Sequence, residues 1–208
     1  MRLHTVLLAA FLLLLAAGTA SAQRAFVQAG YGTDVRRFSA EAGEAVLDGS
    51  AGNLSLGGAG FVTPRWTLGV ELESGGASVE ARTVSVTLAG RPSAITTTYT
   101  LQRRSLSALA GFHTSPARRV RLAAYAGVSF HAIRRTVGSD APPIVLIETP
   151  GPSIYEERSA SPTAGADLSV AIAPRLALVG TIRAQGLTLA GDVQGFSVRP
   201  GGAVRVVF

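Results

Sequence analysis

Apolar and polar residues alternate in the last segment of the chain regularly enough to indicate its backbone conformation. Counting back from the end, one set of alternate positions carries no charge: Phe208, Val206, Val204, Gly202, Pro200, Val198 and Phe196. The intervening set carries both arginines of the segment, Arg205 and Arg199. A period of two residues is the period of a β-strand, so the pattern predicts a strand with one apolar face and one face that bears arginines.

Seven further segments share this period and predict an all-β chain. In 175–189, for example, Leu178 and Ile182 fall on one face and Arg183 on the other. The pattern is weaker near the N-terminus, where Phe26 falls on the polar side and 53–62 is rich in glycine. The eight predicted strands are 25–37, 53–62, 66–73, 103–112, 121–135, 161–172, 175–189 and 196–208.

The connections between these segments alternate in length. Three tight turns contain proline, at 63–65, 115–118 and 173–175, and they alternate with longer polar links at 38–52, 75–97, 136–159 and 190–194. This arrangement is typical of eight antiparallel strands that run up and down with both termini on the short-turn side. Within the second link, residues 78–88 alternate again, which predicts a hairpin that continues beyond the barrel.

The N-terminal residues have the pattern of a cleaved secretory signal. A basic Arg2 precedes an apolar run from Val6 to Ala17, and Ala20-Ser21-Ala22 supplies small residues for cleavage. The apolar run is shorter than the ~20 residues that a membrane-spanning helix needs. We therefore expect residues 1–22 to be removed and residues 23–208 to form one barrel domain.

The composition agrees with an exported β-sheet that meets lipid. The mean hydropathy is +0.33 and only 15% of residues are charged, which is apolar for a secreted soluble domain. There is no cysteine, so disulfides and thiolate metal sites are excluded. The formal charge is +6 and every basic side chain is an arginine, but the arginines are scattered, which argues against a nucleic-acid partner.

A sheet within hydrocarbon has to close, because every backbone N–H and C=O needs an internal partner there. Periodicity alone does not tell which face is outside, so a soluble lipocalin-like barrel remains an alternative. Phe208, at the end of an amphipathic strand, resembles the insertion signal that the barrel assembly machinery of bacterial outer membranes reads. Near the short turns, Phe61, Trp66, Phe112 and Phe208 are expected to form an aromatic girdle.

Residues 23–208 as a whole resemble the small outer-membrane barrels of the OmpA/OmpX type. The resemblance implies an eight-stranded antiparallel up-and-down transmembrane β-barrel in a bacterial outer membrane, in contact with its lipids and lipopolysaccharide. It also implies a lumen filled by side chains and a structural or surface-recognition role.

An eight-stranded barrel is narrow, so charges that face inward must pair. We predict a luminal ion-pair network of Glu71, Glu73, Asp167, Arg103, Arg121, Arg135, Arg183, Arg199 and Arg205, joined by Tyr125, His131 and Gln185, with Asp34 near the rim. The network predicts a plugged lumen. The excess of arginine leaves a narrow path for small anionic solutes as an alternative.

A lipid A-modifying enzyme is the less favoured alternative. Lipid A deacylases of this shape use a His-x-Ser pair that faces lipid, whereas Ser129 and His131 occur here in the reverse order and face the lumen. His113 falls at a turn and His4 lies in the signal, so no histidine cluster is available for a metal. No catalytic, metal or cofactor site is predicted.

Three arginine doublets fall toward the outer ends of strands. In each doublet one side chain faces outward, and a guanidinium is well shaped for a phosphate. The outward members, Arg37, Arg104 and Arg134, are candidate contacts for lipopolysaccharide.

Overall fold

The computed structural model describes residues 25–39, 49–88, 91–114, 119–139, 153–189 and 193–208. The predicted signal peptide and the predicted turn at 115–118 lie outside these residues. The strands are β1 (Ala25–Ser39), β2 (Gly49–Phe61), β3 (Trp66–Gly75), β4 (Ser78–Leu88), β5 (Arg91–His113), β6 (Val120–Ser139), β7 (Ser153–Ala173), β8 (Leu176–Leu189) and β9 (Val193–Val207). Within this described part of the chain, no helix has the length and apolar character needed to span a membrane.

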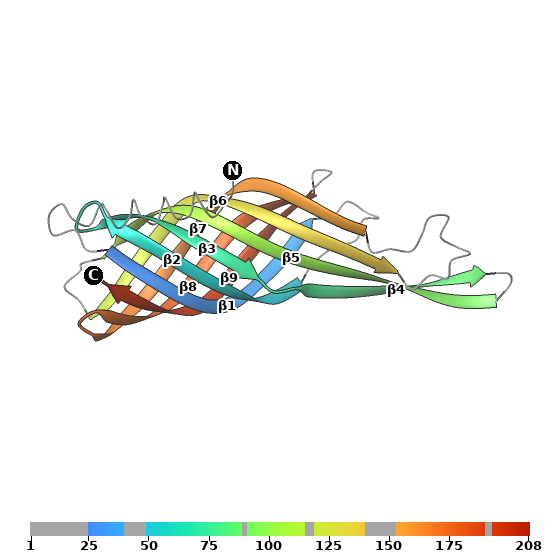
Figure 1. Ribbon diagram of the computed structural model, residues 1–208, viewed down its shortest axis with the longest axis horizontal. Coiled ribbons are helices and arrows are strands. Elements are labelled where there is room, and N and C mark those ends of the chain that lie inside the picture. Colours follow the sequence, from blue (N-terminus) through green and yellow to red (C-terminus); the bar gives the residue numbers. More distant parts are fainter. Residues whose placement is uncertain (1–24, 40–48, 89–90, 115–118, 140–152, 190–192) are drawn as a thin grey trace.

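Eight of the strands close into a ring. Their order is β3-β2-β1-β9-β8-β7-β6-β5, and β5 pairs back onto β3. Every neighbouring pair is antiparallel. Figure 1 shows the tilted strands wound around a common axis, with the C-terminus at the end where β1 begins. The predicted eight-stranded antiparallel barrel is confirmed.

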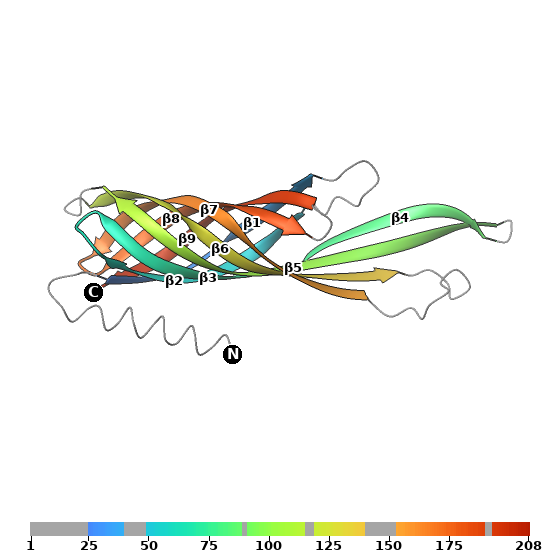
Figure 2. The ribbon, with the colours of Figure 1, turned by 90° about the horizontal axis from the view of Figure 1, so that it is seen from above.

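The ninth strand, β4, lies outside the ring. It pairs with the first part of β5, from Ser78 opposite Leu101 to Leu88 opposite Arg91. The two strands form the long hairpin that extends beyond the barrel in Figures 1 and 2. The predicted hairpin over 78–88 is confirmed, and its strands occupy most of the link at 75–97.

The strands are also longer than predicted at the long-loop end. β2 begins at Gly49, β6 continues to Ser139 and β7 begins at Ser153. Backbone hydrogen bonds between neighbouring strands continue in these extensions beyond the membrane. Because no lipid surrounds the extensions, their outer faces need not be apolar, and the sequence there lacks the alternation that predicted the membrane-spanning parts.

The two faces of the ring differ in polarity in the way that a membrane barrel requires. The exposed outer residues include Leu54, Leu68, Leu122, Phe130, Leu168, Leu178, Ile182 and Val204, whereas the buried inner residues include Gln28, Asp34, Glu71, Arg103, Asp167, Arg183, Arg199 and Arg205. A soluble lipocalin-like barrel has the opposite polarity, and this observation removes that alternative.

Aromatic residues lie on both sides of the wall near the short turns. Trp66 and Phe112 are exposed outer neighbours whose rings pack edge to face at 5.2 Å, and Phe208 is exposed at the end of the chain. The prediction for Phe61 is wrong, because its ring lies 6.2 Å from that of Phe26, which is buried inside. The glycine-rich β2 alternates too weakly in sequence to indicate this orientation.

Candidate functional site in the barrel lumen

An aromatic layer lies inside the barrel near the short turns. Its members are Phe26, Phe61, His113 and Tyr125, with ring centroids 5.0–6.2 Å apart. The His113 ring is buried, and its Nε2 lies 2.9 Å from the Thr67 hydroxyl. Two guanidinium groups from the next layer lie over these rings, Arg205 at 4.1 Å from the Phe26 centroid and Arg183 at 4.7 Å from that of Tyr125.

Above the aromatic layer lies a group of ion pairs that we call the lower cluster: Glu71, Asp167, Arg183 and Arg205, together with Gln28. Arg183 donates to Asp167 at 2.7 Å and to Glu71 at 3.1 Å. Arg205 pairs with the other Asp167 oxygen and donates to the Gln28 side-chain oxygen at 2.6 Å. All of these side chains are buried, so water does not screen their charges.

Glycines make room for the lower cluster. Gly111, Tyr125, Gly165 and Arg183 lie opposite one another across β5, β6, β7 and β8. A Cβ at Gly111 would come within 2.5 Å of the Tyr125 ring, and one at Gly165 within 2.6 Å of Arg183 Cδ. The two large side chains therefore occupy space that any other residue at the glycine positions would fill.

A second group, the upper cluster, lies nearer the long loops: Asp34, Glu73, Arg36, Arg103 and Arg199. Asp34 is fully buried, pairs with Arg103 at 3.0 Å and with Arg36 at 3.4 Å. Glu73 pairs with Arg199 and lies 3.8 Å from Arg103.

Neutral side chains add hydrogen bonds to the upper cluster. The Ser197 hydroxyl donates to Asp34, and that of Ser105 donates to Glu73 at 2.6 Å. Arg199 donates to the side-chain oxygen of Gln185 at 2.8 Å.

A proline lies beside the upper cluster. The described ladder between β1 and β9 has partners at Gly32–Gly201 and again at Val35–Val198, with none between. Pro200, which has no N–H to donate, falls in this gap together with Asp34 and Arg199.

The two clusters differ in charge balance. The lower cluster has two arginines and two carboxylates, whereas the upper cluster has three arginines and two carboxylates. Among the described residues, Nε and Nη2 of Arg36 have no hydrogen-bond partner although both are buried.

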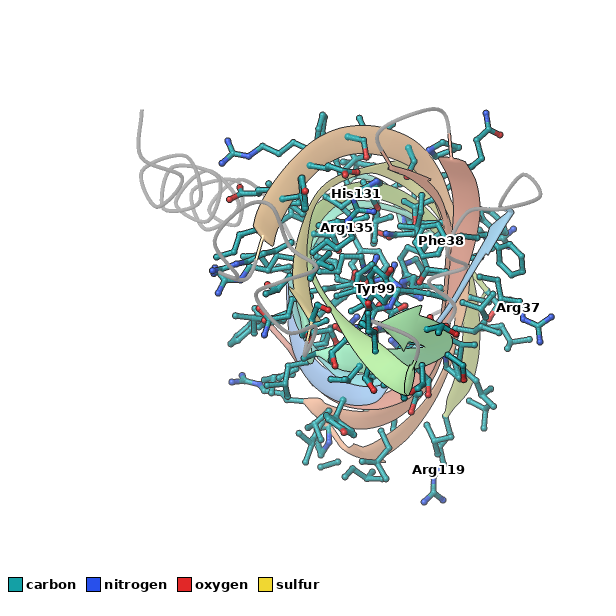
Figure 3. All side chains as sticks on the ribbon, turned by 90° about the vertical axis from the view of Figure 1, so that its right-hand side faces the viewer. Arg37, Phe38, Tyr99, Arg119, His131 and Arg135 are labelled. Carbon is teal, nitrogen blue, oxygen red and sulfur yellow. The ribbon has the colours of Figure 1, made fainter. Side chains whose placement is uncertain are left out.

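An apolar layer lies inside the ring above the upper cluster. Phe38, Leu101, Ile133 and Leu187 pack together and are each at most 6% exposed, with Tyr99 against them. Figure 3, viewed from the long-loop end, shows Phe38, Tyr99, His131 and Arg135 within the ring of strands and Arg37 outside it.

Two predicted network residues lie away from these clusters. Arg121 lies at the short-turn mouth of the barrel. The Arg135 guanidinium lies over the Tyr155 ring, 4.9 Å from its centroid. Conversely, sequence reasoning missed Arg36 as a cluster member and placed Asp34 at the rim, whereas Asp34 is fully buried at the centre of the upper cluster.

The Ser129 and His131 side chains both face the lumen and are buried. The Ser129 hydroxyl lies 2.6 Å from that of Ser107. Within the described residues, neither ring nitrogen of His131 has a hydrogen-bond partner, and no group of three or more His, Cys, Asp or Glu could hold a metal ion.

The outward arginines do not form one patch. Arg104 and Arg134 lie on the neighbouring strands β5 and β6, near Arg158 on β7, and all three are exposed. Arg37 lies on β1, which is separated from β5 in the ring by β2 and β3. The sequence did not single out Arg158, because its position fell in a predicted link.

An exposed carboxylate lies among these arginines. Arg158 donates to Glu156 at 2.8 and 3.1 Å. These hydrogen bonds lower the pKa of Glu156, and the positive charges of Arg158, Arg134 and Arg104 lower it further.

Comparisons with known proteins identify the architecture. No protein-family model and no curated protein matches the chain. Among solved structures, Neisserial surface protein A is similar with a TM-score of 0.54 at 14% identity, over 88% of this chain and 96% of that one. The N-terminal barrel domain of Pseudomonas aeruginosa OprF is similar with a TM-score of 0.52 at 13% identity, over 88% and 97%.

A third similar structure is that of Ail, the attachment invasion locus protein of Yersinia pestis, in complex with the heparin analogue sucrose octasulfate. Its TM-score is 0.51 at 13% identity, over 88% of this chain and 98% of that one. The fold is that of a small outer-membrane β-barrel. With the apolar side chains on the outside of the ring, this architecture places the barrel in a bacterial outer membrane, in contact with its lipids.

Proposed function

We propose that the protein is a non-enzymatic outer-membrane barrel with a closed lumen, which strengthens the membrane and presents its long-loop end for recognition. The observation that carries this proposal is the sequence of layers inside the ring. Two ion-pair clusters lie between an aromatic layer and an apolar layer.

The layers leave little room for a solute. The hollow beside Glu71, Tyr125 and Arg183 measures about 20 Å³, which is enough for one water molecule. A path through the lumen would require buried ion pairs to separate, and an unpaired ion in such surroundings costs several kcal/mol. This cost favours the plug over a conduit for anions.

The positions of Ser129 and His131 argue against catalysis. An activated serine needs a base within hydrogen-bond reach, but the Ser129 hydroxyl is bonded to Ser107. Both residues are buried in the lumen and do not face lipid. Mass spectrometry of lipid A from cells with and without the protein tests this point, and a modified lipid A that depends on the protein would contradict it.

Planar-bilayer recording tests the closed lumen. The wild-type barrel is expected to give no steady conductance in a membrane where a general porin, added as a positive control, conducts. A steady, ohmic conductance that follows the amount of folded protein would instead support the conduit.

We also propose that the outward arginines bind lipopolysaccharide phosphates. Arg104, Arg134 and Arg158 are close enough together to contact one phosphorylated headgroup, while Arg37 would make a separate contact. Ail, which has the same fold, was crystallised with a polyanionic sugar. The lipopolysaccharide that co-purifies is expected to fall more in the triple variant Arg104→Gln/Arg134→Gln/Arg158→Gln than in Arg37→Gln. Equal amounts in wild type and triple variant would remove the proposal.

Insertion is proposed to depend on Phe208 as the signal for the barrel assembly machinery. Its side chain is 66% exposed, so its removal leaves the lumen packing unchanged. Phe208→Ala is expected to lower the amount of folded barrel in the outer membrane but not its stability after refolding in vitro. Unchanged amounts in cells would contradict this role.

A further inference from the structure

The upper cluster holds one positive charge that its own carboxylates do not balance. Asp34 has Arg103 as its closest arginine, through Nε at 3.1 Å and Nη2 at 3.0 Å. Glu73 has Arg199 as its closest arginine. Each carboxylate therefore has an arginine of its own, and Arg36 is left with a more distant contact to Asp34, at 3.4 Å.

The other described carboxylates are engaged elsewhere. Glu71 and Asp167 balance the two arginines of the lower cluster. Glu80 and Glu157 are only half-buried and have interactions of their own, and Glu156 is exposed. The C-terminal carboxylate lies at the opposite, short-turn end of the barrel (Figure 1). Within the part of the chain that the structure describes, no carboxylate thus remains to neutralise the third arginine of the upper cluster.

The three arginines also keep buried donors that have no acceptor. Nη2 of Arg36, Nη1 of Arg103 and Nε of Arg199 have no hydrogen-bond partner among the described residues. All three side chains are at most 3% exposed, so bulk water does not reach these donors. A buried charged donor without an acceptor is costly. The cluster therefore lacks both an acceptor and a negative charge.

Small residues lie beside Arg36 on both neighbouring strands. Its ladder partner on β2 is Gly49, and its partner on β9 is Ser197. On the side of the apolar layer, its Nη1 donates to the Leu101 carbonyl at 3.4 Å. The short neighbours leave room beside the guanidinium group, whereas the apolar layer and the ion pairs limit that room to a compact ligand.

A neutral donor lies next to the cluster. His131 is the ladder partner of Ser105, whose hydroxyl donates to Glu73. The His131 ring is buried inside the barrel (Figure 3), and neither of its nitrogens has a partner among the described residues. One ring nitrogen of a neutral imidazole carries a proton. His131 therefore adds an N–H donor on the β6 side of the cluster.

We propose that the upper cluster binds one chloride ion beside Arg36 and Arg103. A halide accepts hydrogen bonds from several directions, and its single charge cancels the excess charge of the cluster. A buried water molecule would accept the same hydrogen bonds but would leave that charge uncompensated in surroundings of low dielectric. The ion is a structural part of the folded barrel and not a solute in transit, so this role goes beyond the closed lumen proposed above.

The first test is urea unfolding of the folded barrel in phosphatidylcholine vesicles, with chloride replacing gluconate at constant ionic strength. A ligand that binds only the folded state shifts the unfolding equilibrium by mass action. The wild-type unfolding constant is expected to fall about tenfold for each tenfold rise in chloride once the site fills. Bromide is expected to act as chloride does.

The decisive variant is Arg36→Gln, which removes the unbalanced guanidinium group. Its unfolding constant is expected not to depend on chloride. The matched control is Arg37→Gln, because Arg37 is the next residue of β1 but lies outside the ring (Figure 3), and it should keep the wild-type dependence. The proposal is wrong if wild type shows no dependence, if Arg36→Gln keeps it, or if Arg37→Gln loses it.

The second test locates the ion. Crystals grown with bromide in place of chloride are expected to give an anomalous-scattering peak within hydrogen-bond reach of Arg36 and Arg103 in wild type, and none there in Arg36→Gln. Gel mobility with and without boiling checks that each variant is folded. An ordered site without anomalous signal in wild type would assign the position to water and overturn the proposal.

Discussion

The two charged clusters of the lumen both hold buried ions, but they differ in how those ions are paired. The lower cluster pairs two arginines with two carboxylates and stacks both guanidinium groups on aromatic rings. The upper cluster pairs three arginines with two carboxylates beneath an apolar layer. The comparison teaches that burial alone does not determine how much a charged side chain contributes to stability. The balance of positive and negative charges around it matters as much.

In the balanced cluster, each charge neutralises another, so the loss of one leaves an unpaired ion in the interior. In the upper cluster, Arg36 is the arginine in excess: its Nε lies 3.4 Å from Asp34, but Arg103 contacts the same carboxylate more closely, at 3.0 Å. Removal of Arg36 therefore brings this cluster to charge balance.

The largest effect is expected for Asp167→Asn. This change removes the carboxylate shared by Arg183 and Arg205, and breaking a buried pair in this way costs about 3–5 kcal/mol. Urea unfolding in lipid vesicles, followed by the fluorescence of the single tryptophan, Trp66, measures the loss. Glu156→Gln, which changes a carboxylate outside the lumen, serves as the control and should leave the midpoint unchanged. A loss below about 1 kcal/mol would show that the lower cluster does not depend on balance.

The sharpest test of the comparison is a pair of arginine variants. Arg183→Gln leaves Glu71 without the arginine that pairs with it at 3.1 Å and is expected to cost about 3 kcal/mol. Arg36→Gln removes the excess charge and one hydrogen bond, to the Leu101 carbonyl, and is expected to cost about 1 kcal/mol or less. The same unfolding assay applies, and equal losses in the two variants would abolish the distinction between the clusters.

A smaller effect is expected where the lower cluster meets a glycine. In Gly165→Ala the new Cβ would come within 2.6 Å of Arg183 Cδ and 2.5 Å of the Ile182 carbonyl oxygen, and such overpacking costs about 1–3 kcal/mol. Gly180→Ala is the matched control, since a Cβ there has its nearest neighbour at 4.0 Å. Similar unfolding midpoints for both alanine variants would show that the cluster relaxes around an added methyl group.

Alternation in the sequence was sufficient to predict the strands and the inward direction of most cluster members. Glu71, Arg103 and Arg183, for example, all face the lumen as predicted from parity. Alternation tells which face of the sheet a side chain is on, but not how far along the barrel axis it lies. That position depends on strand tilt and register. Asp34 was therefore expected at the rim, although it meets Arg103, which lies 69 residues away in the chain.

The sequence also did not indicate where space is left for large side chains in the lumen. Nothing in the order of residues indicates that Gly111 and Gly165 flank Tyr125, because the three come from different strands. The lipid-facing girdle was predicted correctly for Trp66 and Phe112. The prediction for Phe61 was wrong, because alternation in β2 is too weak to indicate which way this side chain points. Contacts between distant strands thus determine which of the inward charges pair.

The smallest effect concerns the exposed pair of Arg158 and Glu156, which provides the contrast to both clusters. Arg158 lowers the pKa of Glu156 by donating two hydrogen bonds to it. A lowered folded-state pKa stabilises the fold at pH values above the ordinary glutamate pKa, and this contribution disappears as the pH falls through the lowered value. Because both side chains are exposed, solvent screens the pair and the unfolding midpoint should not change measurably in Arg158→Gln. A carbon-detected NMR titration should instead show the Glu156 pKa moving back toward its ordinary value in that variant, while an unmoved pKa would mean that Arg134 and Arg104 set it.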